Sequence, residues 1–474
     1  MKNRIVFLVF LVVGFYSANA MVEPSGTLPV LYVDTEGGAE ITSTEEYLAG
    51  SYYLDGMGYE GVPSIGDAEH PLPLQIRGRG NYTWTNYEKK PYRLKLDKKA
   101  DLMGTGKSKH FCLLPHCDDY YGFLRNTVGF ELSRRIGLAW TPGQQPLELV
   151  LNGDYKGIYF LTDQIKVAAN RVNIVEQEDG ETEAANITGG WLIEFDNYLE
   201  DGQIYVYDEQ DPDKLRLLVT PHSPEVLSPE QYDYMWSLLN NVEKSLDQIP
   251  RHPHTFTEWE EYIDMDTLAC FYIVNEIMDN IESFHGSCWI HKQRGEDTKL
   301  LFGPVWDFGS SFNRSIDHPD FIYNLPEPRG YSSHWIDRIA LSSRFQACVW
   351  RHYAKFRETG GTEMNDFIGD FYNEISAAVA RDCERWPSLG TAYLQACQDA
   401  FKERLAAKVA FLDDQWLKKV GVVEPVMADD GIVRVTDLSG RLIFQGKRDE
   451  MTRLENGQFY ILEQNGKAVV IRMP

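Results

Sequence analysis

The chain has 474 residues, which is enough for two or three domains or for one large domain with an appendage. Hydrophobic residues make up 43% and aromatic residues 13% of the sequence, so we expect a folded chain with a substantial core. The formal net charge of −25 argues against non-specific binding to nucleic acid or to an acidic membrane, and makes any basic cluster notable.

The first 20 residues have the three parts of a secretory signal peptide. Lys2 and Arg4 form a basic start, residues 5–15 are apolar, and residues 18–20 are a small-x-small cleavage site. The apolar run is too short to span a bilayer easily, and no other run of about 18 apolar residues follows. We therefore expect cleavage of residues 1–20 and a secreted or surface-placed protein without stable membrane insertion.

The region after this segment is predicted to be mainly strands. Alternating apolar residues predict strands at 28–35, 72–81 and 89–96. Residues 119–137 have helical periodicity, and Gly137 is suited to end that helix. Residues 146–165 indicate a β-hairpin with Asn152-Gly153 at its turn.

Helices dominate the second half of the chain. Strands at 190–196 and 204–209 are expected to pair with each other, and a hairpin is expected around the turn at 294–298. Helices are predicted at 228–246, with Ser228 as N-cap and Pro229 following it, at 265–280, and through most of 335–418. The predicted fold is α+β, with mixed or antiparallel sheets, a helical C-terminal half and a small all-β module at 422–474.

Six basic residues are concentrated in one short part of this acidic protein. They are Arg77, Arg79, Lys89, Lys90, Arg93 and Lys95. In the predicted strand Arg93 and Lys95 share one face, while Gly78 and Gly80 allow backbone N–H groups to approach a ligand. Such a set suits phosphate binding. The alternative is a solvated strand face that neutralises nearby acids.

A group of acidic residues is expected at the open end of the hairpin at 294–298. Antiparallel pairing about Glu296-Asp297 places Asp307 opposite His285 or Gly286, within two residues. The helix at 265–280 ends on the same side. The four residues expected to cluster there are Asp279, Asn280, Glu282 and Asp307. Such oxygen ligands suit Mg²⁺, although a helix end and a strand end with ordinary polar residues would have the same pattern.

Two other patterns carry less information. The "GTGKS" at 104–108 resembles a phosphate-binding P-loop, but position 101 is Asp where that motif requires Gly. The seven cysteines are odd in number, and no Cys/His cluster has the spacing of a zinc site. Cys112 and Cys117 are close enough in sequence for a local disulfide, and most of the others are expected to be buried thiols.

Several long motifs occur in a familiar order between about residues 28 and 415: "LQIRGRGNYTW", "KKPYRLKLDKK", "DDYYGFLRN", "LELVLNGDYKGIYFLTDQIK" and "GPVWDF". Together they resemble the CotH family of spore-coat-type atypical protein kinases. The resemblance implies a divergent kinase-like fold over 28–418 that uses ATP and Mg²⁺ or Mn²⁺ to phosphorylate Ser or Thr of extracytoplasmic proteins. The six basic residues match the side expected to hold the ATP phosphates.

The resemblance also implies roles for the acidic residues. Asp307 matches the metal-binding Asp of the family, and Glu282, with help from Asn280, would complete the metal site. Asp279 or Glu282 would orient the acceptor hydroxyl. Asp119 and the pair Arg125-Asn126 match another family segment without an assigned role.

Two departures from the family pattern support an alternative. Glu282 stands where an Asn-x-Asp pattern usually supplies Asp, and Gly309 stands where many relatives carry a second Asp. The chain would then be a non-catalytic surface or structural binding protein with the same fold.

The tail and the composition suggest two more interpretations. Residues 435–473 resemble the C-terminal sorting domains of the Bacteroidetes type IX secretion system, which implies contact with secretion machinery. The acidic charge and the 11 Trp residues are also compatible with a secreted glycoside hydrolase. That activity needs two carboxylates flanking a sugar cleft, and no spacing in the sequence indicates such a pair.

Overall fold

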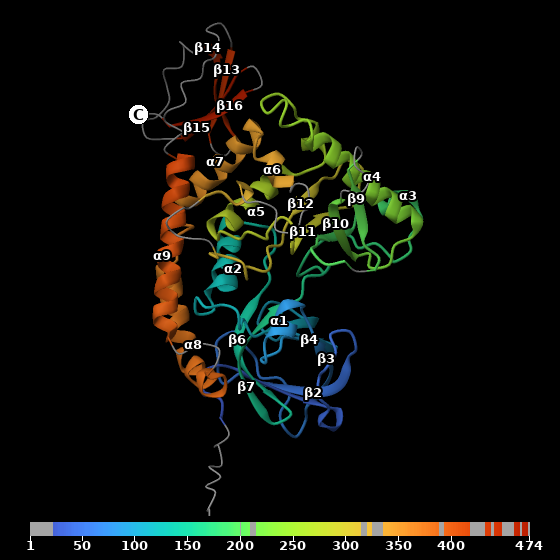
Figure 1. The fold of residues 1–474 in the computed structure, drawn as a ribbon, viewed down its shortest axis with the longest axis vertical. Helices are drawn as coiled ribbons and strands as arrows, with labels where there is room; N and C mark the ends of the chain where they lie inside the picture. The colour runs from blue at the N-terminus through green and yellow to red at the C-terminus, as the bar shows by residue number, and fades with distance from the viewer. Residues whose placement is uncertain are drawn as a thin grey trace, which may run out of the picture.

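The computed structural model describes most of the chain, and the segment expected to be a signal peptide lies outside the described residues. The described residues are 22–199, 201–208, 215–313, 320–324, 335–387, 393–417, 432–437, 440–447, 459–464 and 467–472. They form a mixed α/β structure with a barrel, a second sheet, a helical layer and a small C-terminal sheet (Figure 1). Within them, no helix combines the length and apolar composition needed to cross a bilayer.

The N-terminal part is a closed barrel with the order β1-β2-β3-β4-β5-β7-β6. Its strands are β1 (Val30–Thr35), β2 (Leu48–Asp55), β3 (Leu72–Gly78), β4 (Tyr92–Ala100), β5 (Ser108–Leu114), β6 (Gln144–Leu151) and β7 (Asp154–Asp163). Parallel pairing of β1 with β6 closes it. The α+β prediction did not include a barrel, because its closure joins segments more than 100 residues apart.

Local predictions in the barrel are confirmed. In β4 the side chains of Tyr92, Leu94 and Leu96 are buried, while Arg93 and Lys95 are directed outward. The β6–β7 hairpin turns at Asn152-Gly153, where both residues have positive φ, as a tight hairpin turn requires. Strand β5 was not predicted.

The second sheet has the order β12-β11-β8-β10-β9. Its strands are β8 (Trp191–Phe195), β9 (Ile204–Tyr207), β10 (Leu215–Ser223), β11 (Cys288–Lys292) and β12 (Leu300–Phe302). The predicted pairing of β8 with β9 is wrong, because β10 lies between them. Strand β10 is hard to recognise in the sequence because Pro221 interrupts the alternation of its apolar and polar residues. The β8–β10 register also shifts beside Pro221.

The helices confirm most of the sequence-based boundaries. They are α1 (Tyr82–Asn86), α2 (Leu124–Ile136), α3 (Ala184–Ile187), α4 (Pro229–Leu246), α5 (Met265–Ile277), α6 (Trp335–Ile339), α7 (Ser343–Glu358), α8 (Asn365–Arg385) and α9 (Leu394–Leu412). Ser228 caps α4 in a capping box with Gln231, and Gly137 ends α2 with φ of 89°. Helix α2 begins five residues later than predicted, so Asp119 lies in the loop before it.

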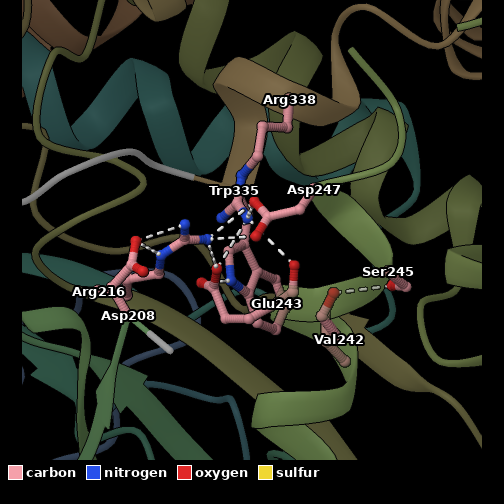
Figure 2. A network of polar contacts seen from close by, with 8 residues as sticks. All are labelled: Asp208, Arg216, Val242, Glu243, Ser245, Asp247, Trp335 and Arg338. Carbon is pink, nitrogen blue, oxygen red and sulfur yellow. Dashed lines mark hydrogen bonds and ion pairs between the residues drawn. The ribbon is translucent and has the colours of Figure 1, made fainter. Parts of the chain in front are cut away.

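A polar network joins the second sheet to the helical layer (Figure 2). The Arg216 guanidinium on β10 lies 2.7 Å from Asp208 and 2.8 Å from Asp247. The Glu243 carboxylate on α4 accepts from Trp335 Nε1 at 2.7 Å and from Arg338 Nη1 at 2.8 Å, both on α6. The two arginines are paired with the three carboxylates of the network. We therefore infer that the network holds α4 and α6 together.

The C-terminal module is a four-stranded sheet of order β14-β13-β15-β16. Its strands are β13 (Ile432–Asp437), β14 (Leu442–Lys447), β15 (Phe459–Gln464) and β16 (Lys467–Arg472). A small all-β module was predicted here. The seven cysteines are all free thiols, so no disulfide joins Cys112 to Cys117.

Candidate functional site

The loop between β5 and α2 holds two consecutive acids with different surroundings. Asp119 is buried, and its carboxylate oxygens accept the backbone N–H groups of Tyr121 and Arg125, each at 2.9 Å. Asp119 therefore fixes the loop and the first turn of α2. Asp118 is only half-buried, and its backbone carbonyl lies 3.4 Å from Arg125 Nη1.

Asp118 and Asp307 direct their carboxylates toward the same side of Gly309. The Oδ2 of Asp118 and the Oδ1 of Asp307 lie 3.4 and 3.1 Å from the position that a Cβ on Gly309 would occupy. Burial raises the pKa of Asp118 to about 6, and the negative charges of Asp307 and Asp119 add to the rise. Two carboxylates in one small space, without a cation between them, favour binding of a cation.

The segment that carries Asp307 is held from both sides. Asn280 Nδ2 donates to the Asp307 carbonyl at 3.2 Å, and the Phe308 N–H donates to Asn126 Oδ1 at 3.2 Å. Asp307 has φ of 53°, in the left-handed region that non-glycine residues adopt at a cost. Its exposed carboxylate accepts the Gly309 N–H at 3.3 Å, which directs one oxygen toward Gly309.

Arg125 clamps the same segment to the β5–α2 loop. Its guanidinium is buried and donates to the Gly309 carbonyl at 2.6 Å and to Asn313 Oδ1 at 2.7 Å. The ring of Tyr120 lies 4.2 Å from the guanidinium carbon and donates from its hydroxyl to the same Asn313 oxygen at 2.6 Å. Arg125 and Asn126, which had no assigned role, therefore position the Asp307 segment.

Four of the predicted basic residues lie on the outer side of the barrel: Arg77, Arg79, Arg93 and Lys95. Arg77 and Arg93 are directly paired neighbours on β3 and β4, and Arg79 lies 6.0 Å from the ring of Trp306, the residue before Asp307. The Nε atoms of Arg77, Arg79 and Arg93 are buried without a hydrogen-bond partner.

These cations also lack acidic partners. Among the described residues, no carboxylate lies within ion-pair distance of Arg77, Arg79, Arg93 or Lys95. In a chain of net charge −25 this is a local excess of positive charge, and it is suited to an anionic ligand.

The other two basic residues are engaged elsewhere. Lys89 Nζ lies 2.5 Å from the Asp382 carboxylate of α8, and both side chains are 1% exposed. Lys90 Nζ donates to the Trp84 carbonyl at 2.5 Å. The structure thus places Lys89 in an internal ion pair and not on the face of Arg93 and Lys95, because β4 begins only at Tyr92.

The predicted acidic cluster is formed only in part. The ladder of β11 and β12 pairs Ile290 with Phe302, within the predicted two residues, but it stops there, so Asp307 has no ladder partner. Asn280 and Asp307 are nevertheless in contact. The Asp279 carboxylate instead lies 3.3 Å from Lys408 Nζ, which also binds Glu276 at 2.6 Å.

Glu282 lies in the turn that follows α5. Its side chain is half-buried, and its carbonyl accepts the N–H groups of His285 and Gly286 at 3.1 and 2.9 Å. Glu282 is two residues beyond Asn280. Of these two residues, Asn280 is the one in direct contact with Asp307.

The residues at Gly309 fit a divalent cation. Asn280 Oδ1 is buried and has no hydrogen-bond partner, which leaves a hard oxygen beside the Asp307 backbone. The carboxylates of Asp118 and Asp307 are oxygen ligands of the same hard kind, which Mg²⁺ and Mn²⁺ prefer. Asp118 is not among the site residues predicted from the sequence. The signal was the Asp118-Asp119 pair directly after a strand, but that strand, β5, was not recognised.

A shallow hollow adjoins the basic residues. Its volume is about 370 Å³, and the residues that line it are Thr44, Gly80, Asn81, Tyr82, Trp84, Thr85, Asn86 and Tyr198. Aromatic rings and amides make up most of the wall, and none of the lining residues is charged. Gly80 follows Arg79 directly, so the hollow and the basic surface are continuous along the chain.

Comparison with known protein families identifies a match. The model of a family described as CotH kinase protein matches residues 76–412, well over half of the chain. The matched range contains the basic residues, Asp118, Asn280 and Asp307. No curated protein matches the chain.

Proposed function

Because this chain belongs to the CotH kinase family, we propose that it is an atypical protein kinase that transfers the γ-phosphate of ATP to Ser or Thr of extracytoplasmic proteins. The observation that carries the proposal is the approach of Asp118 and Asp307 on the same side of Gly309, beside arginines without acidic partners. Phosphoryl transfer depends mainly on positioning and on charge stabilisation, and these two sets of residues supply both.

The acidic residues would serve the metal. Asp118, Asp307 and Asn280 Oδ1 would hold Mg²⁺ or Mn²⁺, which supplies neutralisation of the nucleotide phosphates when bound. Arg79 would contact the phosphates from the Trp306 side, with Arg77, Arg93 and Lys95 extending the positive surface along the strands. Glu282 would orient the acceptor hydroxyl, since Asp279 holds Lys408.

The architecture supports a divergent kinase-like arrangement in which the barrel forms one lobe and the second sheet with its helices forms the other. The acidic residues come from the β5–α2 loop and from the segment after β12, where these parts meet. Export would follow from residues 1–20, and the C-terminal sheet would act as the sorting module for a type IX secretion system.

A second function is favoured by one observation. Gly309 contributes no carboxylate where the two acids meet, so metal binding would be weaker than in a site with three acids. The chain would then be a non-catalytic binding protein that retains the fold. Calorimetry with ATP and either Mg²⁺ or Mn²⁺ distinguishes the two: absence of both heat and thermal shift supports the binding protein.

The direct test is phosphate transfer by purified protein to a panel of Ser- and Thr-containing proteins, with and without Mg²⁺ or Mn²⁺. We expect Asp307→Asn to lower the rate by about 100-fold or more, since a charge-stabilising group is lost. Asp366→Asn is the matched control, because Asp366 is an exposed acid in the first turn of α8. Equal rates for the Asp307→Asn variant and the wild type would remove Asp307 from the site.

A further inference from the structure

A second cluster of metal-ligand side chains lies on helices α5 and α7, away from the site at Gly309. Asp266 is in the first turn of α5, whereas Asn280 follows the C-terminus of that helix. A helix of 13 residues is about 20 Å long, so the two clusters lie at opposite ends of α5. Cys348 and His352 are four residues apart on α7 and therefore share one face of it.

The three side chains converge closely. The ligand atoms of Asp266, Cys348 and His352 all lie within 4.8 Å of one another. His352 Nε2 is 2.8 Å from Asp266 Oδ1, and Cys348 Sγ is 3.3 Å from the same oxygen. Cys348 is buried, whereas the Asp266 side chain is 63% exposed, so the cluster opens to solvent on its carboxylate side.

A fourth residue orients the imidazole. Cys270 Sγ lies 3.6 Å from His352 Nδ1, on the ring side away from Asp266. Metal-binding histidines usually have a partner on the second nitrogen, which fixes the tautomer and directs the other nitrogen to the metal. Cys270 occupies that position here and leaves Nε2 to face Asp266 and Cys348.

We propose that Asp266, Cys348 and His352 form a binding site for a transition-metal dication of the zinc class. Sulfur, imidazole nitrogen and carboxylate oxygen are the three ligand types of zinc sites, and three protein ligands leave one position for water. A hard cation such as Mg²⁺ would not select a thiolate, so this site differs in metal preference from the all-oxygen set at Gly309. No zinc spacing is visible in the sequence because the ligands come from two helices.

Arg351 makes a prediction specific to this metal site possible, because it contacts two of the three ligands. Its guanidinium donates to Asp266 Oδ1 and lies 3.3 Å from Cys348 Sγ, so it occupies the position of the cation. The Arg351 side chain is 24% exposed, so it borders solvent. A metal ion and this guanidinium repel each other, so metal binding must displace it. Removal of the arginine should therefore strengthen metal binding.

The experiment is titration of the full-length protein with Co²⁺, followed by Zn²⁺, in the presence of a reductant that is not a thiol. We expect one Co²⁺ to bind with a thiolate-to-cobalt charge-transfer band, and Zn²⁺ to abolish that band. Cys348→Ser should remove the band, and Asp266→Asn, at an exposed position, should weaken binding about tenfold or more. Arg351→Gln should tighten it about fivefold through lost charge repulsion.

Two controls separate this site from other thiols and from the all-oxygen site. Cys397→Ser removes a half-buried thiol outside the cluster, and Asp307→Asn removes an acid of the other site. Neither should change the band. The proposal is overturned if wild-type protein shows no charge-transfer band, if the band survives in Cys348→Ser, or if Arg351→Gln binds Co²⁺ more weakly than the wild type.

Discussion

Asp118 and Asp307, 189 positions apart in the sequence, direct their carboxylates toward the same side of Gly309. Asp118 comes from the loop after β5, and Asp307 comes from the segment after β12. Arg125 holds the two segments together through the Gly309 carbonyl. The acids are therefore brought together by a fixed backbone contact and do not depend on a bound ligand for their approach.

The substitution Asp118→Asn should change metal binding and stability in opposite directions. The folded state raises the pKa of Asp118 to about 6, so it holds the proton more tightly than the unfolded chain does. The ionised carboxylate therefore lowers stability above about pH 6, and this cost disappears below the ordinary Asp pKa. We expect Asp118→Asn to raise the free energy of unfolding at pH 7.5 by on the order of 2 kcal/mol, with no gain near pH 3.5.

Denaturant unfolding at the two pH values measures that gain, and calorimetry with Mn²⁺ measures the loss of metal binding. Asp366→Asn, at an exposed position in the first turn of α8, is the control: it should leave Mn²⁺ binding unchanged and should not raise the free energy of unfolding. A lower free energy of unfolding for Asp118→Asn at pH 7.5 would mean that the Asp118 carboxylate has a stabilising partner in the folded protein. It would argue against Asp118 as a metal ligand.

Gly309→Asp should strengthen metal binding. A Cβ at this position would lie 3.1 Å from Asp307 Oδ1 and 3.4 Å from Asp118 Oδ2, and the backbone is outside the left-handed region, so an Asp side chain is tolerated after a small shift. A third carboxylate adds a hard oxygen ligand, and we expect Mn²⁺ affinity to rise about tenfold or more. Without metal, repulsion among three acids should lower the melting temperature.

Gly309→Ala separates the effect of charge from that of bulk. It adds the same Cβ without a ligand, so it should leave Mn²⁺ affinity unchanged or lower it. If Gly309→Asp and Gly309→Ala bind Mn²⁺ equally, the carboxylates of Asp118 and Asp307 do not form a metal site.

How much of this site the sequence could predict depends on whether the contact is local. The hairpin turn at Asn152-Gly153, the cap at Ser228 and the outward face of Arg93 and Lys95 follow from short-range patterns, and all three are confirmed. The contact of Asn280 with the Asp307 segment was expected because the helix at 265–280 ends on the side where the hairpin opens, although the hairpin register did not give Asp307 a ladder partner.

Long-range partners could not be predicted in this way. Asp279 meets Lys408, which is 129 residues away, and Lys89 meets Asp382, which is 293 residues away. No periodicity in the sequence links such pairs, because they form only when α8 and α9 pack against the rest of the chain. The barrel closure was missed for the same reason, whereas Asp118 was missed because strand β5 before it was not recognised.

Arg79→Gln should weaken ATP binding without loss of stability. The Arg79 guanidinium has no acidic partner among the described residues and lies over Trp306, so its removal breaks no ion pair. Loss of one charged contact to phosphate should reduce ATP affinity about 10- to 100-fold. Calorimetry with ATP and Mn²⁺ measures this, and thermal denaturation should give an unchanged melting temperature. An unchanged ATP affinity would exclude Arg79 from the phosphate side.

Lys89→Met should have the reverse pattern, although Lys89 belongs to the same basic sequence cluster. The substitution leaves the Asp382 carboxylate 1% exposed, with the Ile158 N–H at 2.9 Å as its remaining donor. Breaking a buried ion pair from one side typically costs about 3–5 kcal/mol, because the other charge is left without its partner. Urea unfolding should show this loss, and the double variant Lys89→Met/Asp382→Asn should recover a large part of it. ATP affinity of the folded fraction should be unchanged. A Lys89→Met protein with normal stability and weakened ATP binding would return Lys89 to the phosphate side and contradict its assignment to the internal ion pair.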